Sequence, residues 1–221
     1  MIFIQKSPAP KSLSQYKNEC KREMNLGYTN LLDDYPEKDA LRQQLAVEQG
    51  YLCAYCMRRI SLDFQATVIE HVRPQATYPK EQLEYGNLVL CCDGKENDID
   101  KQNHCDESKK NCEIKYSPVT IPYIETTIRY ERNGRIFSED LQWDSDLNTV
   151  LNLNVKRICN NRKAAWTAIQ DLLARNPGQR TRSEIEAMLK SLNSRNHENK
   201  RSEYCGVMTY VLKRHPSFQS A

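Results

Sequence analysis

The spacing of apolar and polar positions divides the chain into three stretches that predict different structures. Residues 12–50 have helical spacing, with breaks marked by the prolines at positions 8, 10 and 36. Their clearest element is residues 39–50, where Leu41, Leu45 and Val47 recur near helical intervals and Gly50 takes a favoured position for ending a helix. We therefore expect a helical region over residues 1–50, which leads directly into Cys53.

The middle stretch, residues 51–116, contains two runs with the composition of strands. Residues 66–72 form the first run, which Arg73 and Pro74 end because proline cannot donate to a β-ladder. Leu88–Cys92 is the second, and a polar loop over residues 93–103 separates it from a short helix that begins near Cys105. This stretch has little room for an apolar core of its own, and so small a core usually needs a metal.

The last stretch, residues 117–221, predicts a hairpin followed by helices. Residues 127–130 and 135–137 flank Asn133 and Gly134, which together are a strong turn signal. Apolar residues then recur at helical intervals as far as Leu173, the sequence Asn-Pro-Gly at 176–178 predicts a break, and a further helix begins near residue 183. We expect an α+β, mainly helical fold with three regions, 1–50, 51–116 and 117–221.

Composition narrows the class of protein. The chain has 221 residues, of which 28% are charged, and no apolar run approaches the roughly 18 to 20 residues that cross a bilayer. The N-terminus lacks the pattern of a secretory signal, so we expect a cytoplasmic protein with no membrane partner. Nine cysteines are an odd number, which fits poorly with a closed set of disulfides and favours metal binding. A net charge of +3 is too small to indicate nucleic acid by itself.

The clustered cysteines predict a structural zinc site. Zinc prefers four soft or borderline ligands in a tetrahedron, and two residues between Cys53 and Cys56 let one turn present both sulfurs to one ion. Cys92 and Cys105 are the natural second pair. Cys91 can replace Cys92, and His104 can replace Cys105, since imidazole is an equally good ligand. Only one of Cys91 and Cys92 can serve, because adjacent strand residues point to opposite faces.

Glu70 and His71 form the predicted reactive element. Hydrolysis of a phosphodiester needs a base to take a proton from water and a cation to offset the charge that grows on the phosphate. A histidine with a pKa near ~6.5 can be that base at neutral pH. A neighbouring carboxylate prefers a hard cation such as Mg²⁺.

The order of these residues resembles that of HNH endonucleases. The resemblance is carried by Glu48-Gln-Gly-Tyr-Leu-Cys-Ala-Tyr-Cys56, Ile69-Glu-His71 with Pro74, Asn87-Leu-Val-Leu and the run from His104 to Lys109. Within that family the chain is most similar to the HNH proteins of Septu-type and retron-associated anti-phage systems. The later sequence Leu151-Asn-Leu-Asn154, with Arg162 downstream, also resembles that group. It departs from the family in the spacing of Cys92 and Cys105, between which residues 93–103 look like an inserted loop.

The resemblance implies a zinc-stapled ββα-metal (HNH) module flanked by helical regions, with a role for each matching residue. His71 is expected to activate water as the general base, and Asn87 to hold the loop that positions it. Glu70 and Asp106 are expected to bind a catalytic Mg²⁺ or Mn²⁺. Lys109 is expected to approach the phosphate from the same helix face as Asp106.

The resemblance also implies the function. The expectation is a metal-dependent endonuclease that hydrolyses DNA as the effector of a bacterial anti-phage system, together with an ABC/SMC-like ATPase. Related systems add a retron reverse transcriptase and its DNA as partners. Two alternatives stay open: a zinc-supported module that binds nucleic acid or protein without cutting, and an HNH-type toxin that cuts RNA or tRNA.

Overall fold

Three helices form the N-terminal region, as the apolar spacing predicts. In the computed structural model, which describes residues 1–95, 102–175 and 180–219, they are α1 (Lys11–Glu19), α2 (Lys21–Asn25) and α3 (Lys38–Glu48). Leu41 and Leu45 bury the inner face of α3. Gly50 follows with a φ of +62°, the left-handed conformation that ends many helices, and a Cβ there would lie 2.5 Å from Cγ of Arg201.

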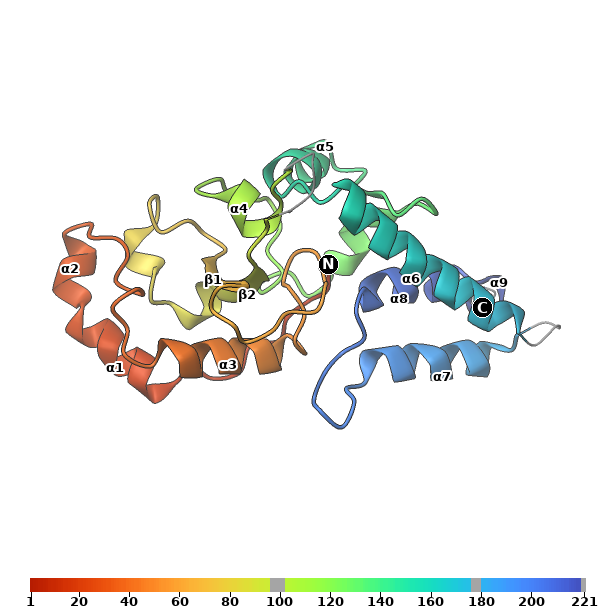
Figure 1. Ribbon diagram of the computed structural model, residues 1–221, viewed down its shortest axis with the longest axis horizontal. Coiled ribbons are helices and arrows are strands. Elements are labelled where there is room, and N and C mark those ends of the chain that lie inside the picture. Colours follow the sequence, from red (N-terminus) through yellow and green to blue (C-terminus); the bar gives the residue numbers. More distant parts are fainter. Residues whose placement is uncertain (96–101, 176–179, 220–221) are drawn as a thin grey trace.

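A two-stranded antiparallel sheet follows α3, and it confirms both strands predicted in the middle stretch. β1 (Thr67–His71) pairs with β2 (Leu88–Cys92) in a register that places His71 opposite Leu88. All five residues of β2 are buried, because the strand contacts α3 and the short helix α4 (Cys105–Lys109). Figure 1 shows the two strands between these helices. The chain between the strands contains the 3₁₀ turns η1 (Pro79–Glu81) and η2 (Tyr85–Asn87).

The C-terminal region contains the predicted hairpin and the predicted helices. β3 (Arg129–Tyr130) pairs antiparallel with β4 (Ile136–Phe137) across the turn at Asn133 and Gly134, and the 3₁₀ turn η3 (Ile124–Thr127) precedes them. Then come α5 (Leu141–Ser145), the π-helical turn η4 (Asp146–Val150), α6 (Lys156–Ala174), α7 (Arg182–Asn193), α8 (Cys205–Lys213) and α9 (Pro216–Gln219). The break predicted at 176–178 lies outside the described residues, as does much of the loop predicted at 93–103.

Two hydrophobic clusters hold these elements together. The larger one draws buried side chains from all three predicted regions, among them Leu45, Leu90 and Leu147. The middle stretch therefore uses a shared core, as its scarcity of apolar residues suggests. A second cluster joins α6, α7 and α8 through Ile169, Ile185, Leu189 and Leu212, at the end of the molecule where the C-terminus lies (Figure 1).

The fold is α+β and mainly helical, as predicted. The region boundaries at 50 and 116 stay predictions. Among the described residues, no helix combines the length and the apolar character that a membrane span requires.

Candidate metal centre and active site

Four buried cysteines from three separate elements come together beside β2. Cys53 and Cys56 lie in a tight turn, closed by hydrogen bonds from Cys53 N to Arg58 O (2.9 Å) and from Met57 N to Cys53 O (3.1 Å). Cys92 ends β2, and Cys105 begins α4. The four Sγ atoms all lie within 4.8 Å of one another. Among the described residues this is the only group of three or more potential ligands so close together, and it can hold a metal ion such as zinc.

The spacing of the sulfurs fits a tetrahedral ion. Cys53 Sγ lies 3.8 Å from Cys105 Sγ, and Cys56 Sγ lies 3.8 Å from Cys92 Sγ. A tetrahedron of thiolates about 2.3 Å from zinc has edges of about 3.8 Å, whereas a disulfide needs about 2.05 Å. Burial would raise the pKa of Cys53, but hydrogen bonds from neighbouring thiols, that of Cys105 foremost, hold it well below its usual value. Burial raises the pKa of Cys105, so a second thiolate here needs a cation.

The two alternative ligands lie beside this group and are not members of it. Cys91 is fully buried next to Cys92 in β2, and although its thiol interacts with that of Cys53, it is not one of the four sulfurs that lie within 4.8 Å of one another. His104 is also fully buried, and its Nδ1 lies 3.1 Å from Cys105 Sγ and 4.0 Å from Cys92 Sγ. The geometry therefore selects Cys92 and Cys105 as the second pair and leaves the His104 ring as a neighbour of their sulfurs.

The cysteine group fixes α4 against the sheet and so positions Asp106. Cys105 has a φ of +52° and donates its N–H to Leu151 O at 2.9 Å, an uncommon conformation for a residue that begins a helix. Gly94 accepts a hydrogen bond from His104 N at 2.9 Å, and a Cβ on Gly94 would lie 2.1 Å from His104 O. Only glycine lets the chain leaving β2 pass this close to the start of α4.

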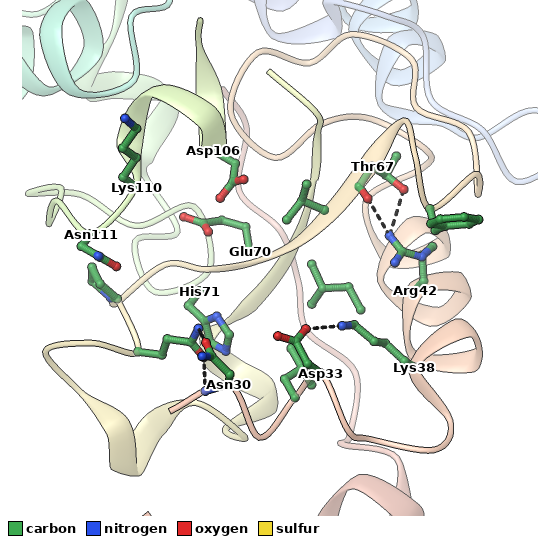
Figure 2. Close-up of a pocket in the computed structure, with 16 residues that line it drawn as sticks. Asn30, Asp33, Lys38, Arg42, Thr67, Glu70, His71, Asp106, Lys110 and Asn111 are labelled. Carbon is green, nitrogen blue, oxygen red and sulfur yellow. Dashed lines mark hydrogen bonds and ion pairs between the residues drawn. The ribbon is translucent and has the colours of Figure 1, made fainter. Parts of the chain in front are cut away.

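Glu70 and Asp106 bring two carboxylates together between β1 and α4. Figure 2 shows their carboxylates directed toward each other. Burial raises the pKa of Glu70 to about 8, and its hydrogen bond with Asp106 acts in the same direction. Lys109 opposes this rise, since its Nζ lies 2.7 Å from Glu70 Oε1. Tyr55, which lies between the first two cysteines, donates its hydroxyl to the same oxygen at 3.3 Å.

Lys109 is a buried structural contact in this arrangement. Its side chain is fully buried, and Nζ also donates to the backbone oxygen of His71 at 3.0 Å. The residues after it, Lys110 and Asn111, line the neighbouring cavity, and Lys109 is not among the lining residues. Lys109 therefore connects α4 to the end of β1 through both Glu70 and His71.

His71 is held in one tautomer by the chain between the strands. Its Nε2 lies 2.9 Å from the backbone oxygen of Gln82. A carbonyl oxygen only accepts, so Nε2 carries the proton and Nδ1 is the basic nitrogen. Burial lowers the pKa of His71 below its usual 6.5, which keeps the ring neutral at pH 7. The sequence gives no signal for Gln82, because the partner is a backbone atom.

Asn87 ties the end of β1 to the start of β2. Its Oδ1 accepts from Arg73 N at 2.8 Å, and its Nδ2 donates to Arg73 O at 3.0 Å and to Glu81 O at 3.3 Å. The residue is itself buried. Both sides of the loop that carries Gln82 are thereby fixed relative to His71.

Glu70, His71 and Asp106 line one cavity of about 460 Å³, which we call the central pocket. Glu70 and His71 point to opposite sides of β1, as strand alternation requires, and His71 faces the segment around Asn30 (Figure 2). His71 is the last residue of β1, so both side chains reach the cavity at the end of the strand. Three basic residues also line it: Lys38, Arg42 and Lys110.

Arg42 is a pocket residue that sequence analysis missed. It lies on α3 among buried apolar residues, is 6% exposed, and its Nη1 donates to Thr67 O at 2.9 Å and to Thr67 Oγ1 at 3.0 Å. These bonds anchor the start of β1 (Figure 2). The sequence offers one signal for this role: Arg42 lies between Leu41 and Leu45 on the apolar face of a helix, where a charged residue is unusual.

Comparison with known proteins assigns no family to the chain. No protein-family model matches it, and no curated protein matches it either.

Proposed function

We propose that the chain is a metal-dependent endonuclease of the HNH type that hydrolyses phosphodiester bonds in DNA. One observation carries the proposal: a carboxylate pair and a neutral, oriented imidazole meet in a single pocket. The scaffold of that pocket is two antiparallel strands and a helix joined by four cysteines. A purely structural zinc domain has no use for such a pair of acids beside an imidazole.

His71 supplies the base in this proposal. Because Nε2 donates to Gln82, the proton that water loses is taken by Nδ1, and the positive charge that forms is shared through Nε2 with the Gln82 carbonyl. The lowered pKa of His71 keeps the basic form present at neutral pH. The ring needs no rearrangement before it acts, since its partner belongs to a loop that Asn87 fixes at both sides.

Glu70 and Asp106 are the residues that would hold the catalytic cation. The buried carboxylate of Glu70 and the half-buried one of Asp106 face each other, and two such groups repel unless a proton or a cation lies between them. Their oxygens are the hard ligands that Mg²⁺ and Mn²⁺ prefer, and these ions bind through one or two carboxylates and keep several waters. Such an ion, when bound, offsets the negative charge that develops on the phosphate oxygens. Lys109 holds Glu70 in place for this role.

The biological setting rests on the resemblance of the sequence alone. In that setting the protein is the nuclease effector of an anti-phage system and acts with an ABC/SMC-like ATPase. A retron reverse transcriptase with its DNA joins the complex in related systems. Co-expression with an ATPase encoded beside this chain, followed by size-exclusion chromatography, tests the partner separately from the chemistry.

His71→Ala tests the chemistry. We expect the variant to lose roughly 10²- to 10⁴-fold in cleavage rate, while zinc content and thermal stability stay near those of the wild type. His197→Ala is the matched control, because His197 is exposed and far along the chain. Plasmid DNA and total RNA, each with Mg²⁺ or Mn²⁺, are the substrates. Equal cutting by His71→Ala removes the catalytic assignment, and cutting of RNA alone favours the toxin alternative.

A further inference from the structure

An aromatic side chain stands exposed at the rim of the central pocket. Phe64 is 70% exposed, more than any other aromatic residue of the described chain. It also lines the pocket that contains Glu70, His71 and Asp106. Leu62, in the same turn, is 41% exposed. Single exposed apolar residues are common on protein surfaces. One that lines the central pocket can instead contact a bound molecule, and the neighbouring residues indicate which kind.

The turn that presents Phe64 is firmly built. Asp63 Oδ1 accepts from Gln65 N at 2.8 Å, and the Asp63 carbonyl accepts from Ala66 N at 3.1 Å and from Thr67 Oγ1 at 2.8 Å. Arg42 then fixes Thr67 from α3. None of these bonds involves the Phe64 side chain, so the turn does not need an aromatic residue at this position.

The rest of the pocket offers the groups that recognise a nucleotide. Lys110 supplies positive charge for phosphate; Lys38, which pairs with Asp33 at 2.5 Å, and the buried Arg42, which is bonded to Thr67, add positive charge to the wall of the pocket. The side-chain amide of Asn111 can bond the edge of a base, and those of Asn30 and Gln75, which bond each other at 2.7 Å, keep further donor and acceptor positions. An aromatic face adds the one contact that every base can make, since each base has a π-face. A cavity of about 460 Å³ lies within the usual range for small-ligand sites.

We propose that Phe64 stacks on a nucleobase of the substrate next to the bond that is cut. This inference rests on the proposed nuclease function and adds a substrate class to it: nucleic acid whose base at the cut lies outside a duplex stack, as in a single strand or an unpaired end. A base in an intact duplex must first be unstacked, which costs a few kcal/mol. The basic side chains and the proposed catalytic residues of the same pocket favour a nucleic acid over a protein as the molecule that contacts Phe64.

Binding measurements in a cleavage-deficient background test the proposal. In His71→Ala protein with Mg²⁺, fluorescence anisotropy compares three oligonucleotides of one sequence: a single strand, its blunt duplex, and a single strand with an abasic site at the cut. We expect the single strand to bind tighter than the duplex. Adding Phe64→Ala should weaken single-strand binding roughly 5- to 150-fold, whereas Phe64→Trp should retain it. Leu141→Ala is the matched control, since Leu141 is 87% exposed on α5 and outside the pocket.

The abasic strand separates base stacking from other roles of Phe64. Stacking predicts that Phe64→Ala has little effect on the abasic strand, and that Phe64→Trp fluorescence is quenched by the normal strand alone. If adding Phe64→Ala leaves single-strand binding unchanged, or weakens binding of the normal and abasic strands equally, the stacking proposal is wrong while the nuclease proposal stands. If the wild type cuts neither DNA nor RNA and no oligonucleotide binds, the nuclease proposal itself fails.

Discussion

At the scale of single residues, Lys109 shows how burial changes the role that spacing suggests. It lies three residues after Asp106, which predicts a shared helix face, yet α4 ends at Lys109 and the side chain turns under β1. There it pairs with Glu70 and His71 O. We expect Lys109→Ala to lower the free energy of unfolding by about 3–5 kcal/mol at pH 9, where Glu70, with a pKa of about 8, is ionised and loses its buried partner, and by less at pH 7. Urea unfolding measures the loss.

Two further variants show whether the loss of stability comes from this ion pair or from removing any lysine on α4 or next to it. Lys110→Ala, at an exposed neighbouring position, should change the free energy of unfolding by less than about 0.5 kcal/mol. Lys109→Met combined with Glu70→Gln should recover much of the loss, because the charge that needs a partner is then absent. A stable Lys109→Ala protein that binds DNA less well would instead support a direct contact of Lys109 with phosphate.

The raised pKa of Glu70 predicts that binding of the proposed catalytic cation is linked to the release of a proton. With a pKa of about 8, Glu70 is mostly protonated at pH 7 in the cation-free protein, and a metal binds the ionised form. Mn²⁺ binding should therefore release close to one proton at pH 7, and its affinity should rise about tenfold per pH unit until pH 8 and then level off. Calorimetry in buffers of different ionisation enthalpy counts the proton. The same count at pH 6 and pH 9 would contradict the raised pKa.

At the scale of elements, the cysteine group connects the turn at 53–57, β2 and α4. We expect Cys92→Ser to lose the capacity to bind zinc and to lower the melting temperature, because the four ligands would join three elements that are separate in the sequence. Cys91→Ser is the matched control: it changes the same atom in the neighbouring residue of β2, which lies outside the group of four. Zinc content by mass spectrometry should fall only in Cys92→Ser. Loss in both variants would make Cys91 a ligand.

The elements that carry this site could be predicted from the sequence because their signals are local. Short apolar runs bounded by polar residues indicated β1 and β2, Gly50 marked the end of α3, and Asn133-Gly134 indicated the hairpin. Apart from those of Asn87, the contacts that orient the chemistry could not be predicted, since they join distant positions through backbone atoms or buried polar groups. The Gln82 carbonyl on His71 and the Tyr55 hydroxyl on Glu70 are examples. A 3₁₀ turn such as η1 is too short to have an apolar periodicity from which it could be predicted.

At the scale of the whole molecule, the two hydrophobic clusters depend on each other unequally. α6 and α8 run from the larger cluster, through Ile158 and Val207, into the smaller one, through Ile169 and Leu212. α7 belongs to the smaller cluster alone, packing against α8 and α9. The smaller cluster therefore needs helices that the larger one holds in place, whereas the larger cluster needs nothing from α7.

Ile185→Ala tests this dependence. Ile185 is fully buried on α7, so its truncation should cost about 2–5 kcal/mol locally. Hydrogen exchange should then speed up in α7 and α9, with β1, β2 and α4 unchanged and zinc content and cleavage near those of the wild type. Removing zinc from the wild-type protein should affect both clusters. Hydrogen exchange should become faster in β2 and α4, and also in α7. If Ile185→Ala also loosens β2, the two clusters unfold as one unit, and the C-terminal helices support the central pocket directly.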